Sequence, residues 1–229
     1  MKFRIANKIF LIKNEDNKEL DLLLTQLLCF YEPADNKSED IEILFTNEDL
    51  AKNIKYYNPK IHGEFENGFL MSVYYGQIGF TINNDIPTVK VNLNNEFYNK
   101  NIISKFISNG EFSSALDKLS SIFYESIIIP SLFFFDDLAL IHSAGVCDAN
   151  GNGIVLGGTG GIGKTSMEIE LCYYDKYKFV NDDIGIVDSN GMLFPNYAYP
   201  KIYGYNLEGY PKLKNEIFSQ RSIVDKFWR

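Results

Sequence analysis

A run of small residues in the last third of the chain has the composition of a phosphate-binding loop. It fits the P-loop pattern G-x-x-x-x-G-K-[ST], and with the serine that follows it comprises Gly158, Thr159, Gly160, Gly161, Ile162, Gly163, Lys164, Thr165 and Ser166. Glycines let successive backbone N–H groups approach phosphate oxygens closely, and a helix that begins at such a loop adds its positive end. We expect Lys164 to reach the β- and γ-phosphates and the Thr165 hydroxyl to ligate Mg²⁺. The pattern predicts a site for ATP and Mg²⁺, against the alternative of a glycine-rich turn with a chance lysine.

Two adjacent carboxylates, Asp182 and Asp183, interrupt the apolar segment FVNDDIGIV further along the chain. Charges inside an apolar strand are costly unless something compensates them. Because side chains alternate along a strand, we expect one carboxylate to face the glycine-rich loop and the other to point away or towards a metal. The functional interpretation is one Mg²⁺ ligand and one base at an acceptor hydroxyl. The alternative is a solvent-exposed pair where Asn181 and Asp182 open a turn.

A single histidine, His142, lies within the apolar segment LALIHSAGV upstream of the loop. A lone histidine in an apolar strand is usually a hydrogen-bonded core residue, and its position alone favours that interpretation. The strand that holds His142 and the strand that enters the loop are expected to be neighbours. His142 could therefore lie near the floor of the site.

The elements that must position these residues follow from the hydrophobic pattern. We expect strands at 138–147, 154–158 and 178–188, a turn at 148–153 and a helix after the loop, which together make residues 136–229 a nucleotide-binding core. For residues 1–135 the same pattern predicts an α+β region. Its expected elements are strands at 2–12 and 41–46, a helix at 20–30, an antiparallel meander at 68–93 and a helix at 112–129. We expect Pro130 to end or kink that last helix. The fold class predicted is α/β, an α+β region followed by a P-loop core with a mixed sheet.

Composition limits the class of protein. Of 229 residues, 45% are hydrophobic, which is enough for a core and argues against disorder or a small disulfide scaffold. A net charge of −8 argues against nucleic-acid binding. There is no signal-peptide pattern, and the longest apolar stretch, 127–135, is too short to span a bilayer. The cysteines Cys29, Cys147 and Cys172 show no metal-ligand spacing, so we expect buried thiols in a cytoplasmic protein without membrane contact.

The segments IHSAGV, GGTGGIGKTS and FVNDDIGIV, taken in order, resemble the catalytic core of HPr kinase/phosphorylase and the wider group of HPr-kinase-like proteins. That family has a phosphoenolpyruvate-carboxykinase-like nucleotide fold, in which a strand histidine precedes the loop and an Asp-Asp pair follows it. The resemblance covers roughly residues 138–188. It implies that Asp182 is the base that activates an acceptor serine, that Asp183 assists the metal with Thr165, and that His142 hydrogen-bonds the phosphate or Asp182.

The chain departs from the family pattern at two points. The serine usual inside the loop is Gly160 here, and no Glu-x-Arg-Gly segment follows Asp183, with Glu208 and Arg221 as the only loose counterparts. The chain also ends soon after Asp183 for such a core, so we expect either a fragment of a longer protein or a fold completed differently. Kinase activity is implied more strongly than phosphorylase activity.

The sequence thus predicts an ATP- and Mg²⁺-dependent kinase that transfers the γ-phosphoryl group to a serine or threonine of a peptide or small protein. The N-terminal region would recognise that acceptor or build a subunit contact in a homo-oligomer. A small-molecule or carboxykinase-like phosphotransferase is one alternative, and the sparse arginines argue mildly against it. A non-catalytic nucleotide-binding module is the other.

Overall fold

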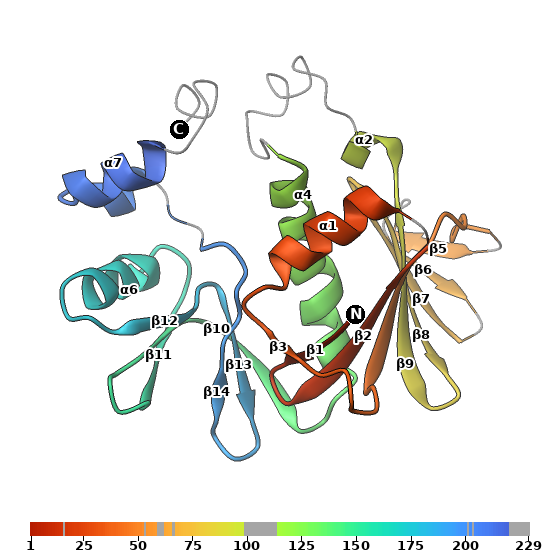
Figure 1. Ribbon diagram of the computed structural model, residues 1–229, viewed down its shortest axis with the longest axis horizontal. Helices are drawn as coiled ribbons and strands as arrows, with labels where there is room; N and C mark the ends of the chain where they lie inside the picture. Colours follow the sequence, from red (N-terminus) through yellow and green to blue (C-terminus); the bar gives the residue numbers. More distant parts are fainter. Residues whose placement is uncertain are drawn as a thin grey trace. The chain divides into compact units, whose positions relative to one another are not determined.

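The computed structural model of the chain describes residues 1–15, 17–52, 54–58, 62–65, 67–98, 114–200, 202 and 204–219 (Figure 1). These residues divide into two compact units, one up to residue 98 with 114–134 and the other from Phe135 onward. Each unit combines helices with one sheet. The mixed α/β content predicted from the sequence is confirmed.

The first unit is built on a nine-stranded sheet in the order β3-β1-β2-β4-β9-β8-β7-β6-β5. The neighbours β2, β4 and β9 run parallel, and the remaining pairs are antiparallel. The strands are β1 Lys2–Ile5, β2 Lys8–Asn14, β3 Glu32–Pro33, β4 Ile41–Phe45, β5 Lys55–Asn58, β6 His62–Phe65, β7 Gly68–Val73, β8 Gly76–Asn83 and β9 Ile86–Leu93.

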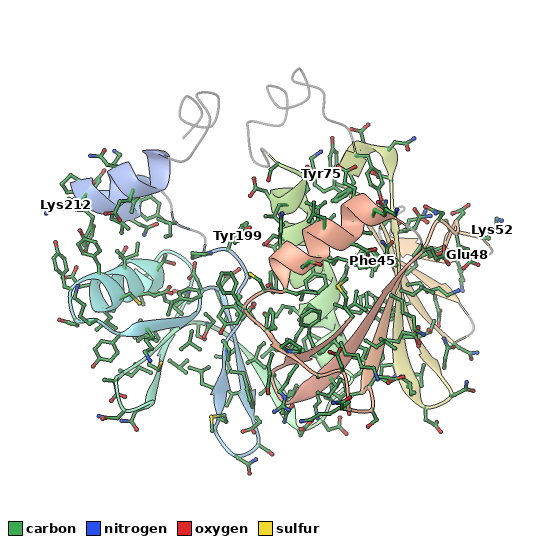
Figure 2. The ribbon with its side chains drawn as sticks, in the orientation of Figure 1. Phe45, Glu48, Lys52, Tyr75, Tyr199 and Lys212 are labelled. Atoms are coloured by element: carbon green, nitrogen blue, oxygen red, sulfur yellow. The ribbon has the colours of Figure 1, made fainter. Side chains whose placement is uncertain are left out.

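The helices of this unit supply the other half of its core. They are α1 Lys18–Leu27, α2 Asn95–Tyr98, α4 Ala115–Ser121, the π-helical η1 Ile122–Ile128 and α5 Ile129–Leu132. Asn17 caps α1 by accepting a hydrogen bond from the Leu20 N–H, and leucines at helical spacing are buried along one face. Helix α1 packs against α4. Phe45 of β4, labelled in Figure 2, is buried and lines a small cavity together with Leu20 of α1.

The meander at 68–93 and the strand near 41–46 are confirmed, whereas three other expectations for this unit are corrected. Residues 2–12 form a hairpin instead of one strand, because Ala6 takes a left-handed φ of 55° and turns the chain. Of the two outcomes expected for Pro130, an end to the helix is wrong, because the helix continues to Leu132 after the wider π-helical turn that precedes the proline. Cys29 is exposed because it follows the last turn of α1, while Cys147 and Cys172 are half-buried.

The second unit is built around one long strand. Along one edge, strand β10 pairs with β11. Along the other edge, residues 138–142 of β10 pair with β13 and residues 145–147 pair with β12. Strand β13 also pairs with β14, and all of these pairs are antiparallel. Helix α6 connects β11 to β12 and packs on β10, β11 and β12 (Figure 1). The elements are β10 Leu138–Cys147, β11 Gly153–Gly157, α6 Lys164–Tyr173, β12 Lys178–Asn181, β13 Ile184–Asp188, β14 Leu193–Phe194, the 3₁₀ helix η2 Gly204–Leu207 and α7 Pro211–Ser219.

The single strand expected at 178–188 is broken at the two aspartates. Strand β12 ends at Asn181 and β13 begins at Ile184, because Asp183 takes a left-handed φ of 71°. The Ser143 N–H donates to the Asp183 carbonyl at 3.0 Å, which holds this break against β10. The alternation of side chains expected along a continuous strand therefore does not apply to Asp182 and Asp183.

Among the described residues, no helix combines the length and the apolar character needed to cross a membrane.

Candidate functional site

The glycine-rich segment 158–163 is an exposed loop between β11 and α6. Gly161 and Gly163 have φ values of 78° and 99°, a backbone conformation that residues with a Cβ rarely adopt. At Gly158 a Cβ would come within 2.9 Å of a methyl carbon of Ile162. The loop conformation therefore needs these glycines, and it leaves the backbone open to solvent.

Helix α6 begins at this loop with a bare N-terminus. Its N-cap is Gly163, so no side chain accepts a hydrogen bond from the first turn. The first N–H groups of a helix have no partner within the helix and attract anions. The Lys164 ammonium lies back over the loop, where it donates to the carbonyls of Gly158 at 3.0 Å and Thr159 at 3.2 Å. Positive charge and unpaired donors are thus gathered at one exposed place.

Asp182 lies at the end of β12 and is joined to the same helix. The Thr165 hydroxyl donates to its Oδ1 at 3.0 Å. Asp182 is only 5% exposed, whereas the loop beside it is open. The two residues expected to serve a nucleotide site from distant parts of the chain therefore lie in contact.

Asp183 points to a different partner. Its Oδ1 lies 3.1 Å from Nε2 of His142 on β10, and the two side chains are 40% and 53% exposed. An exposure of this size does not fit the interpretation of His142 as a core residue. The pair is therefore accessible to solvent.

A tightly packed scaffold holds the two aspartates. The preceding residue, Asn181, is fully buried and donates to the Ser143 carbonyl at 2.7 Å. A Cβ at Gly145 would lie 2.1 Å from Asn181 Oδ1, and one at Gly185 would lie 2.6 Å from Ser143 Oγ. The sequence fits β12 and β13 closely against β10 by placing glycines opposite these polar side chains.

Glu168 is a site residue that the sequence analysis missed. It lies on α6, three residues after Thr165 and four after Lys164, a spacing that puts all three on one side of a helix. It is 3% exposed, and neither carboxyl oxygen has a hydrogen-bond partner within the described part of the chain. Burial, and then the charge of Asp182, raise its pKa to about 8. The spacing was visible in the sequence, but the burial was not.

The donors near Thr165 are suited to a hard cation. Within the described part of the chain, no three side chains of His, Cys, Asp or Glu form a ready-made metal cluster. The Thr165 hydroxyl and the Asp182 carboxyl are in contact, and the buried carboxyl of Glu168 follows one turn after Thr165 on α6. Mg²⁺ prefers oxygen ligands and commonly takes only one or two carboxylates, completing its shell with water and phosphate.

The other candidates from the sequence lie elsewhere. Ser166 accepts a hydrogen bond from Asn206 of η2 at 2.8 Å, which ties the start of α6 to that turn. Glu208 is exposed after η2, and Arg221 lies outside the described residues. Arg4, one of the few arginines of the chain, belongs to the first unit, where it pairs with Glu32.

Comparison with known proteins identifies no relative, since no protein-family model, curated protein or solved structure matches the chain. The function is therefore argued from the geometry of the site and from the resemblance of its motifs.

Proposed function

We propose that the chain is an ATP- and Mg²⁺-dependent kinase that transfers the γ-phosphoryl group to a serine or threonine hydroxyl of a peptide or small protein. The observation that carries this proposal is the 3.0 Å hydrogen bond between Thr165 Oγ1 and Asp182 Oδ1 at the helix that follows the glycine-rich loop. A P-loop threonine beside a carboxylate is the pair with which P-loop enzymes hold the metal of a nucleotide.

Phosphate binding is assigned to the loop and the start of α6. The unpaired N–H groups at the Gly163 cap would receive phosphate oxygens. The Lys164 ammonium, which contacts two loop carbonyls, would turn to the β- and γ-phosphates. This exchange replaces neutral acceptors by charged ones and is favourable because charge-assisted hydrogen bonds are stronger.

The geometry supports a division of roles between the aspartates that is the reverse of the one implied by the family resemblance. Asp182, buried against Thr165, would hold the metal, and Mg²⁺ when bound would neutralise charge on the β- and γ-phosphates. The Asp183 side chain is 40% exposed and its Oδ1 lies 3.1 Å from Nε2 of His142, which suits a base that meets an incoming acceptor.

The transfer step then needs only positioning and one proton acceptor. The acceptor oxygen forms a bond to the γ-phosphorus as the bond from that phosphorus to the bridging oxygen breaks, and ADP leaves. The hydroxyl proton passes to the Asp183–His142 pair. The ammonium of Lys164 and the N–H groups of the loop stabilise the charge on the transferred group.

The remaining parts of the prediction are carried forward as proposals. The first unit would recognise the acceptor or form a subunit contact in a homo-oligomer, and the protein would work in the cytoplasm without nucleic acid or membrane. A peptide or protein acceptor is favoured over an anionic small molecule because the chain has a net charge of −8.

The proposal is tested by incubating the protein with radiolabelled ATP and Mg²⁺ together with libraries of serine- and threonine-containing peptides. Labelled phosphoserine or phosphothreonine is the result expected. Tight binding of Mg·ATP without transfer to any peptide, protein or small-molecule acceptor would instead favour a non-catalytic nucleotide-binding module.

A further inference from the structure

Glu168 is a buried acid without a partner. The residue is 3% exposed, and among the residues that the structure describes neither carboxyl oxygen finds a hydrogen-bond partner. Leaving a carboxyl group in this state is costly, whether it is ionised or neutral. By contrast, Glu170 on the same helix is exposed and accepts a hydrogen bond from the Tyr210 hydroxyl. The environment of Glu168 therefore needs an explanation that its helix does not provide.

The surroundings of Glu168 point towards Thr165 and Asp182. Side chains on an α-helix lean towards its N-terminus, so Glu168 extends along α6 towards the turn that holds Thr165. Asp182 accepts a hydrogen bond from Thr165 in that same turn. Burial first, and then the charge of Asp182, raise the pKa of Glu168 to about 8. Cys172, one turn further along, is a neutral thiol at neutral pH, because burial foremost raises its pKa to about 11. It therefore offers Glu168 no charge.

We propose that Glu168 belongs to the cation site. Its carboxylate and that of Asp182 bind the same divalent cation, either directly or through the water molecules that the cation carries. This inference rests on the proposed function, since it places the metal of that function between α6 and the end of β12. It accounts for both orphaned oxygens, because a cation or its water shell supplies the partners that the protein lacks.

A simpler alternative assigns Glu168 no ligand at all. In that case the side chain is a neutral acid that fills space under α6. Glutamine has nearly the same shape and no charge, so Glu168→Gln separates the two cases. A neutral filler loses nothing on this change, whereas a cation site loses one of its two carboxylates.

The test measures binding of Mn²⁺ to the full chain without nucleotide, by the loss of the free-ion signal in electron paramagnetic resonance. Glu168→Gln is compared with the wild type, with Asp182→Asn and with Glu170→Gln as the matched control. We expect Glu168→Gln and Asp182→Asn each to weaken Mn²⁺ binding by about tenfold or more, and Glu170→Gln to bind as the wild type does. Thermal unfolding of each variant checks that it is folded, and Glu168→Asp, which keeps the charge, should bind Mn²⁺ better than Glu168→Gln.

Unchanged Mn²⁺ affinity in folded Glu168→Gln would overturn the inference, and so would a wild type that binds no Mn²⁺. Neither result decides the proposed function, which is judged separately by titration with ATP. If Asp182→Asn alone loses Mn²⁺, the cation site stands without Glu168.

Discussion

Asp182 and Asp183 are adjacent and chemically identical, yet their surroundings differ. Asp182 is buried and accepts a hydrogen bond from Thr165, while Asp183 is half-exposed beside His142. The left-handed φ of Asp183 turns the two carboxylates to different partners. The sequence predicted which residues to examine, but it could not divide their roles, because the division depends on one backbone angle.

The role proposed for Asp183 is tested by Asp183→Asn. Asparagine tolerates a left-handed φ, so the fold should be retained. Affinity for Mg·ATP should stay within a few-fold of the wild type, because Thr165, Lys164 and Asp182 are untouched. Phosphoryl transfer should fall by roughly 10²–10⁴-fold, because the proton acceptor is lost. Calorimetry and a labelled-phosphate assay measure the two effects, and an unchanged transfer rate would remove Asp183 from the base role.

His142→Ala examines the partner of that base. The side chain is 53% exposed, so its removal should leave the melting temperature close to that of the wild type. Transfer should fall by roughly tenfold or more, because Asp183 loses the group that orients it. A large drop in melting temperature with normal specific activity in the folded fraction would return His142 to a purely structural role.

At the scale of elements, helix α6 holds a buried acid, Glu168, that should make the free energy of unfolding depend on pH. Burial and the charge of Asp182 raise the pKa of Glu168 from 4.5 to about 8 in the folded protein. Between these two values the folded state keeps a proton that the unfolded chain has released. The free energy of unfolding should therefore fall as pH rises through this window, by at most about 1.4 kcal/mol per pH unit from this group.

The comparison of interest is wild type against Glu168→Gln in denaturant unfolding, with a chelator present to remove divalent cations. The Gln variant lacks this titration, so its stability relative to the wild type should improve as pH rises from about 5.5 to about 7.5. A relative stability independent of pH would show that Glu168 does not hold its proton in the folded state.

Gly145 allows strand β10 to pack closely against Asn181 of the neighbouring strand β12. Gly145→Ala would place a methyl group 2.1 Å from Asn181 Oδ1, whereas Gly157→Ala on β11 meets no atom within 4 Å. We expect Gly145→Ala to destabilise the fold by about 1–3 kcal/mol and to weaken nucleotide binding by shifting Asp182. Gly157→Ala should change neither property, and denaturant unfolding with a nucleotide titration compares the two. Equal behaviour of both variants would contradict the close fit assigned to Gly145.

Patterns within short segments predicted most elements of this chain. The leucine spacing of α1 and the glycine-rich start of α6 are local signals, and both helices form where those signals lie. The break between β12 and β13 was expected only as an alternative, a turn opened by Asn181 and Asp182, because an apolar segment with two aspartates resembles one continuous strand. The hairpin at Ala6 was missed because alanine is not a usual turn residue.

At the scale of the whole molecule, the α/β class followed from the alternation of helical and extended patterns, but the strand order did not. The parallel neighbours β2, β4 and β9 come from segments far apart in the chain, and nothing in their composition indicates which of the strands pair with one another. The contact between Thr165 and Asp182 also joins distant segments. The sequence predicted that one of the two aspartates would face the loop, but it could not show which one contacts Thr165.

The central claim is that this chain binds Mg·ATP at the loop before α6. It is tested most directly by calorimetric titration of Mg·ATP into the wild type and Lys164→Ala, with Lys178→Ala as a control that removes an exposed lysine on β12. The account predicts saturable binding by the wild type and by Lys178→Ala, and an affinity lower by about tenfold or more in Lys164→Ala, which lacks the ammonium that faces the phosphates. Equal affinity in Lys164→Ala, or no binding by the wild type, would contradict it.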